Sequence, residues 1–214
     1  MIRERLDQLS VEEVANALTH GFGLALSIAG FLFLVGFAII KGDGWHLTSS
    51  LIYGASLVIL YAASTVYHTA LDPKAKKRLQ VLDHCCIYLL IAGSYTPFIL
   101  IVFRDGFGFG LLAIVWAAAA FGIAMKIIFR GRFSAVGIVL YLLMGWLGVI
   151  AAQPLYLALG AAPLALVVAG GLSYTAGMIF FGWHGLRHHH AIFHVFVLVG
   201  SILHFIAVAA FVLV

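Results

Sequence analysis

The sequence HAIFHVFVLVGSILHFIAVAAFVLV, residues 190–214, combines two features that decide how the chain folds. It contains no Asp, Glu, Lys or Arg, and it is long enough as a helix to cross the hydrocarbon core of a bilayer, which needs about 20 residues. His190 and His194 stand at its beginning, four residues apart and therefore on one face of that helix. Two imidazoles therefore lie at the beginning of a membrane span. Because neutral histidine is the commonest metal ligand and intramembrane histidines usually have a function, this pair predicts part of a site.

The rest of the chain shares the apolar character of this stretch. Of its 214 residues, 64% are hydrophobic and only 9% are charged, and its mean hydropathy is +1.13. This composition excludes an ordinary soluble domain and indicates an integral membrane protein. The formal charge of +4 is explained by contact of basic loops with anionic lipid headgroups, so we predict no nucleic-acid partner.

The charged residues fall in clusters, and the uncharged gaps between them are the predicted spans. Five gaps have the length of one span, and the gap 133–186 has room for two helices separated at Gln153-Pro154, Gly160 and Pro163. The five single gaps are 20–40, 44–71, 84–103, 106–125 and 188–214. We therefore predict an all-α protein with seven transmembrane helices over residues 20–214, preceded by an amphipathic cytoplasmic segment over residues 1–19.

The distribution of basic residues predicts the orientation of the bundle in the membrane. Of the 12 lysines and arginines, all but Lys41 and Arg104 lie on the side that carries the N-terminus. Loops rich in Lys and Arg stay in the cytoplasm. We therefore expect a cytoplasmic N-terminus and a C-terminus outside.

Polar groups collect at the cytoplasmic ends of three different spans. Ser64 and His68 lie one turn apart at the end of the second span, Asp83 opens the third, and His190 and His194 begin the seventh. The predicted topology brings all of them to one side of the membrane at similar depth. Taken singly, His68 also fits an interfacial residue, and Asp83 also fits a charge that complements the dipole at a helix N-terminus.

Together these groups predict a metal site. Three imidazoles, His68, His190 and His194, match a catalytic zinc site in which water is the fourth ligand. Zinc would lower the pKa of that water toward about 7, Asp83 would hold or deprotonate it, and Ser64 would donate to the developing oxyanion. The same residues, Asp83 on the third span included, also suit a zinc clamp that ties three helices together without turnover. Zinc is the preferred ion, while copper, iron and nickel are chemically possible.

The segment before the first span carries a polar stripe. Glu13, Asn16 and His20 are spaced three and four residues apart, so they share one helix face that leads toward the predicted site. A solvated face is the alternative interpretation of this spacing. Ser10, followed by Glu12 and Glu13, predicts a capped helix start.

Other residues are predicted to be structural. His184 and His188 are also four apart and compete with the pair at 190 and 194, but they lie in the polar turn around Arg187, where headgroup contact is expected. The adjacent Cys85 and Cys86 are interpreted as small apolar fillers rather than a disulfide.

The ordered set of motifs resembles the signature of the progestin and adipoQ receptor superfamily, and within it the bacterial haemolysin-III branch. The motifs are Glu13-x2-Asn16-x2-Thr19-His20, Ser64-x3-His68, Asp83, and His190-x3-His194 followed by Gly-Ser-Ile-Leu-His-Phe. The resemblance covers nearly the whole chain. It implies a multi-pass protein of a bacterial inner membrane, with seven helices, a cytoplasmic N-terminus, zinc on the three histidines and Asp83 near a zinc-bound water. The arrangement is also similar to that of alkaline ceramidases, which implies hydrolysis of a lipid amide.

Three functions are therefore carried forward. The favoured one is a zinc-dependent intramembrane hydrolase acting on an amide or ester of a membrane lipid. The second is a non-enzymatic regulator of membrane lipid or energetics with structural zinc. The third is the lytic pore that the branch name implies, although the spans show no amphipathic pore-lining repeat. No pattern in the sequence favours a particular oligomeric state.

Overall fold

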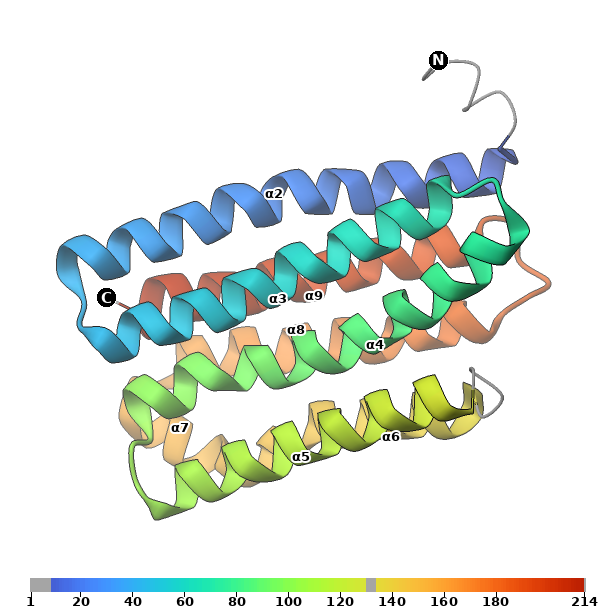
Figure 1. Cartoon of the computed structure of the whole chain (residues 1–214). Coiled ribbons are helices and arrows are strands. Elements are labelled where there is room, and N and C mark those ends of the chain that lie inside the picture. The colour runs from blue at the N-terminus through green and yellow to red at the C-terminus, as the bar shows by residue number, and fades with distance from the viewer. Residues whose placement is uncertain (1–8, 130–133, 214) are drawn as a thin grey trace.

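The computed structural model describes residues 9–129 and 134–213. Within these ranges seven helical spans are long and apolar enough to cross a membrane. They run side by side, and successive spans reverse direction (Figure 1). The predicted all-α fold with seven transmembrane helices is confirmed.

Five spans are single α-helices. They are α2 (Val11–Lys41), α3 (Gly44–Thr69), α5 (Gly106–Ile128), α8 (Ala161–Gly182) and α9 (His189–Phe211). The predicted cap of the first helix is confirmed, because the Ser10 hydroxyl accepts a hydrogen bond from the backbone N–H of Glu13 at 3.2 Å. The helix then continues without interruption through residue 19, and residues 1–8 of the proposed amphipathic segment lie outside the described ranges. Asp43 caps α3, and hydrogen bonding by the His46 side chain lowers the pKa of this carboxyl to about 2.

The third span consists of α4 (Pro73–Pro97) and a π-helical turn, η1 (Phe98–Val102). The change of winding comes at Pro97, since proline cannot donate to the α-helical ladder. The N–H of Phe103 donates instead to the carbonyl five residues earlier, that of Phe98, at 3.1 Å.

The start of α4 differs from the prediction. The charges at Lys74–Arg78 suggested a loop and a span beginning at residue 84, but the helix begins at Pro73. Asp72 caps it by accepting from the N–H of Ala75 at 2.7 Å, and proline is favoured in a first turn. Asp83 therefore lies inside the helix, and its alternative interpretation as an N-terminal dipole charge is wrong.

The fifth span is also compound. It consists of α6 (Ser134–Trp146), a 3-10 turn η2 (Leu147–Ala151) and α7 (Ala152–Leu159). The break before the sixth span is at Gly160, whose φ of 85° favours glycine. Of the residues predicted to supply this break, Gly160 does so, whereas Gln153-Pro154 and Pro163 lie in the first turns of α7 and α8, where proline is tolerated.

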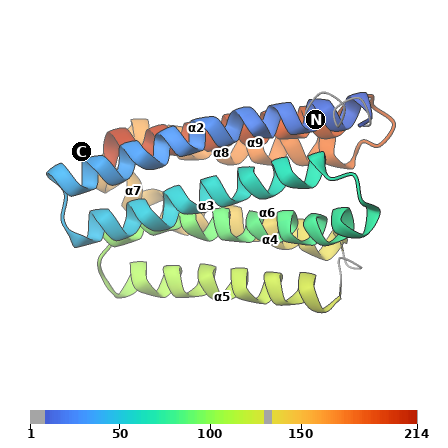
Figure 2. The same ribbon diagram turned by 45° about the horizontal axis from the view of Figure 1, so that its top comes forward.

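The helices form a bundle in which α3 packs against α2 and α4, and α9 packs against α2 and α8. One apolar core joins α2, α3, α4 and α9, and a second joins α4, α5 and α6. The start of α2, the α3–α4 connection and the α8–α9 connection lie at one end, called here the N-terminal end, and the C-terminus lies at the other (Figures 1 and 2). The end of α3 and the start of α9 therefore meet at this end.

Candidate metal centre

The three predicted ligands come together at the N-terminal end. His68 lies in the last turn of α3, and His190 and His194 lie in the first two turns of α9. One potential ligand atom from each ring lies within 4.8 Å of the others. The ring centroids are 4.5 Å apart for His190 and His194, and 5.1 and 5.0 Å from His68. Three imidazoles gathered in this way are a donor set that zinc sites use.

The environment of His68 fixes which of its nitrogens faces the cluster. The side chain is only 2% exposed, and its Nδ1–H donates to the Glu13 carboxylate at 2.6 Å. Nε2 is buried and has no hydrogen-bond partner among the described residues. Because Nδ1 is directed to the carboxylate, Nε2 is the nitrogen left for a metal, and this is the carboxylate–histidine arrangement typical of metal ligands.

Glu13 is itself held in place by an ion pair. Its second carboxylate oxygen lies 2.8 Å from the Nζ of Lys76, in the first turns of α4. Glu13 on α2, held by a cation on α4, thus orients His68 on α3. Lys76 was not predicted as part of the site, because only the packed helices show that the start of α4 approaches α2.

His194 is oriented in a comparable way. Its Nδ1 lies 3.2 Å from the hydroxyl of Thr19, and that hydroxyl donates to the backbone carbonyls of Ala15 and Asn16. Because the hydroxyl proton of Thr19 points to these carbonyls, its oxygen accepts from the Nδ1–H of His194. The Nε2 of His194 is then left for a metal. Thr19 belongs to the motif that suggested the family, but it was not predicted as a site residue.

The remaining residues of the α2 stripe are buried against the centre. Asn16 is 3% and His20 4% exposed, so the stripe is not a solvated face. The ring of His20 stacks on that of His194, with centroids 3.5 Å apart and planes 19° from parallel. Within the described ranges, both nitrogens of His20 and the Oδ1 of Asn16 lack hydrogen-bond partners. They are unsatisfied polar atoms next to the three potential ligands.

Asp83 and Ser64 lie beside this cluster. Asp83 is 9% exposed and Ser64 is fully buried, and both line the same cavity as His190 and His194. The Ser64 hydroxyl is close to the Asp83 carboxyl, but the pair does not have the geometry of a hydrogen bond. A carboxylate that can take a proton and a hydroxyl that can donate one therefore accompany the imidazoles.

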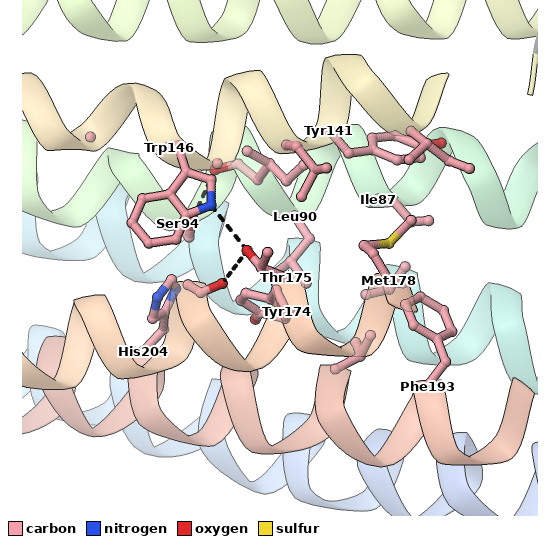
Figure 3. A pocket seen from close by; sticks show the side chains of 18 of the residues that line it. Ile87, Leu90, Ser94, Tyr141, Trp146, Tyr174, Thr175, Met178, Phe193 and His204 are labelled. Carbon is pink, nitrogen blue, oxygen red and sulfur yellow. Dashed lines mark hydrogen bonds between the residues drawn. The ribbon is translucent and has the colours of Figure 1, made fainter. Parts of the chain in front are cut away.

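The cavity has a volume of about 230 Å³ and runs between α4, α6, α8 and α9. Most of its lining is apolar, as Figure 3 shows for Leu90, Met178 and Phe193. Farther along it, the indole N–H of Trp146 donates to the Thr175 hydroxyl at 3.0 Å (Figure 3). An acyl chain suits such a lining.

A second pocket of about 210 Å³ adjoins the centre from the bundle end, and its lining is polar. It is formed by Ser10, Glu12, Glu13, Asn16, Tyr67, His68 and His190. His190 lines both spaces. The three histidines therefore lie where an apolar cavity meets a polar pocket.

The competing pair does not join the cluster. His184 is exposed, with Nδ1 2.8 Å from the carbonyl of Gly182, and the Nε2 of His188 accepts from the Nε of Arg187 at 3.1 Å. Both lie in the α8–α9 connection, as expected. Cys85 and Cys86 are buried free thiols, as interpreted from the sequence.

The chain is similar to proteins of one family along most of its length. The profile of the family described as Haemolysin-III related matches residues 9–205. The chain is 47% identical over 190 residues to the Hemolysin-3 homolog of Bacillus subtilis (strain 168), an overlap that covers 89% of each chain. It is 44% identical over 209 residues to the Hemolysin-3 of Bacillus cereus, covering 98% of this chain and 95% of that one.

A more distant similarity reaches animal proteins. The monocyte to macrophage differentiation factor of Homo sapiens is 29% identical over 205 residues, covering 92% of this chain and 83% of its own. The range matched by the family profile, residues 9–205, includes all three clustered histidines. The chain is a multi-pass membrane protein that belongs to the Haemolysin-III related family, the bacterial branch of the progestin and adipoQ receptor superfamily.

Proposed function

We propose that the protein is a zinc-dependent intramembrane hydrolase that cleaves an amide or ester of a membrane lipid. The observation that carries this proposal is an apolar cavity of about 230 Å³ that reaches two of the three clustered histidines, together with Asp83 and Ser64. An acyl chain in this cavity would bring its carbonyl to the histidines. The apolar walls of the cavity exclude water from the acyl chain. They also strengthen the polar interactions around the lipid carbonyl.

The residues present fit a zinc ion. His68 offers a buried Nε2 that lacks a described hydrogen-bond partner, and the protons on Nδ1 of His68 and His194 are directed to Glu13 and Thr19. Three neutral imidazoles suit zinc better than calcium or magnesium, which prefer oxygen ligands. Zinc bound there would supply Lewis acidity and a water activated near neutral pH.

The protein's own groups then have distinct roles. Asp83 accepts the proton of the water that attacks the carbonyl carbon and returns it to the departing amine or alcohol. Ser64 donates its hydroxyl hydrogen to the oxygen on which negative charge develops. Glu13, held by Lys76, keeps His68 in one orientation.

Substitution of Asp83 tests this proposal. We expect Asp83→Asn to lower fatty acid release from a ceramide-like amide at least about 100-fold, with zinc content unchanged, because the amide cannot take the proton. Asp72→Asn is the matched control, since asparagine also caps a helix and Asp72 is exposed. Release that survives Asp83→Asn would overturn the proposed role of this carboxylate.

A structural role for zinc is the second candidate. The potential ligands and the residues that orient them come from α2, α3, α4 and α9, so one ion would tie four helices together. In a regulator of this kind, His68→Ala lowers thermal stability and cellular function together, and no hydrolysis product accumulates with any lipid.

The name of the Bacillus cereus relative, Hemolysin-3, favours a third candidate, a lytic pore. A pore makes liposomes leak ions in proportion to the amount of protein. Tight liposomes at high protein loading would exclude it.

A further inference from the structure

One cation in the cavity is not explained by the proposed chemistry. Lys126, in the last turn of α5, is only 7% exposed and lines the cavity. Every other lysine and arginine in the described ranges is half-buried or exposed. A buried charge in a membrane protein is costly and is normally paired.

No anion among the described residues pairs with Lys126. No carboxylate oxygen lies within ion-pair distance of its Nζ in these ranges, although Asp83 lines the same cavity. Its titratable neighbours on α4 include the thiol of Cys85 and the imidazole of His84. Its ammonium is thus placed at an apolar cavity without a counter-ion from residues 9–129 or 134–213.

The neighbouring helix leaves room for this ammonium. A Cβ added to Gly137 of α6 would lie 3.1 Å from Cε and 3.2 Å from Nζ of Lys126. The glycine therefore permits the lysine to lie against the backbone of α6. The position of Lys126 in the last turn of α5 places it near the N-terminal end of the bundle, where the metal centre also lies.

We propose that Lys126 forms an anion-binding subsite and that the cavity prefers acidic amphiphiles, in which an acyl chain ends in a carboxylate or a phosphate. The chain occupies the apolar walls, and the head supplies the counter-ion that the lysine lacks. This inference depends on the proposed function only for the identity of the substrate, because preferential binding needs neither zinc nor turnover.

Binding to chelator-treated, full-length protein in nanodiscs tests the subsite. Dodecanoic acid, dodecyl phosphate and dodecanol are compared by displacement of radiolabelled dodecanol. We expect at least one of the two acidic probes to bind about tenfold or more tightly than the alcohol, because a charge-assisted hydrogen bond in an apolar site favours the ion. Tighter binding of the phosphate would indicate a phospholipid headgroup as the natural source, and tighter binding of the carboxylate a free fatty acid.

Variants assign this preference to Lys126. Lys126→Met should bring the ratio of acid to alcohol affinity close to one, and Lys126→Arg should retain the preference. Lys41→Met removes an exposed lysine at the other end and should change nothing. Gly137→Ala should weaken the preference without removing the charge, because the added methyl group displaces the ammonium. This variant replaces Lys126→Met as the test if Lys126→Met does not fold.

The proposal is overturned if the wild-type protein binds acid and alcohol equally, or if Lys126→Met keeps the preference. Because the metal is removed and the probes contain no amide or ester bond, these outcomes are independent of hydrolysis. A failed hydrolase assay with an intact binding preference would count against the proposed enzyme only.

Discussion

Glu13 connects the polar pocket at the end of the bundle to the metal centre. It accepts from His68 at 2.6 Å and from Lys76 at 2.8 Å, so it fixes a ligand on one helix from a cation on another. Such supporting carboxylates raise ligand basicity and hold the ring in place. The metal affinity of the centre should therefore depend on a residue that does not bind the metal.

We expect Glu13→Ala to weaken zinc binding about 10- to 100-fold, since the Nδ1–H of His68 loses its acceptor. The measurement is zinc affinity by competition with a chelator. Glu12→Ala is the control, because Glu12 is the adjacent carboxylate and does not contact the three potential ligands. Equal affinities for the two variants would show that Glu13 does not support the centre.

Thr19 should have a similar effect through His194. Thr19→Val keeps the shape of the side chain but removes the acceptor for Nδ1–H, so zinc affinity should fall about tenfold. Thr65→Val is the matched control, because the Thr65 hydroxyl donates only to the backbone carbonyl of Tyr61. An affinity unchanged from wild type in Thr19→Val would show that the 3.2 Å contact does not orient the ring.

At the scale of elements, the close approach of α2 to α3 keeps the polar stripe against the centre. A Cβ added at Gly23 would lie 2.5 Å from two ring atoms of Tyr61, whose hydroxyl donates to Ser201 of α9 at 2.9 Å. The glycine thus lets three helices meet. Gly36, on the same helix, has open space around it.

This contrast predicts opposite signs for two similar substitutions. Gly23→Ala should lower the melting temperature, because overpacking costs about 1–3 kcal/mol and exceeds the gain in helix propensity. Gly36→Ala should leave it unchanged or raise it slightly. Thermal unfolding in detergent measures both, and a melting temperature of Gly23→Ala at or above that of Gly36→Ala would contradict the described packing.

The positions of the helices could largely be predicted from the sequence. Uncharged gaps identified all seven spans, because hydrocarbon accepts only long runs without charge. The start of α4 was misplaced because its first turns are basic, although Asp72 and Pro73 carry the signal for a capped helix.

Contacts between helices were harder to predict. The pair of Lys76 with Glu13 and the isolated position of Lys126 depend on which faces meet, and a single sequence does not record this. The cluster of three histidines could be predicted, because it requires only the spacing of residues within a helix and the order of the spans.

At the scale of the whole molecule, the odd number of spans places the two termini at opposite ends (Figure 1). The basic residues concentrate near the N-terminal end, and this asymmetry predicts that the metal centre faces the cytoplasm. A C-terminal alkaline phosphatase fusion should therefore be active outside the cell, and an N-terminal fluorescent protein should fluoresce inside. An inactive phosphatase fusion on a chain that is inserted in the membrane would reverse the orientation.

We propose that His68, His190 and His194 form a zinc site, and the metal content of the purified protein is the decisive measurement. Mass spectrometry should find about one zinc ion per chain in protein purified without chelators, and none in the double variant His190→Ala/His194→Ala. The double variant His184→Ala/His188→Ala removes a pair with the same spacing from the α8–α9 connection and should keep the ion. Wild-type protein without zinc, or equal zinc in the two double variants, would show that His68, His190 and His194 do not form a zinc site.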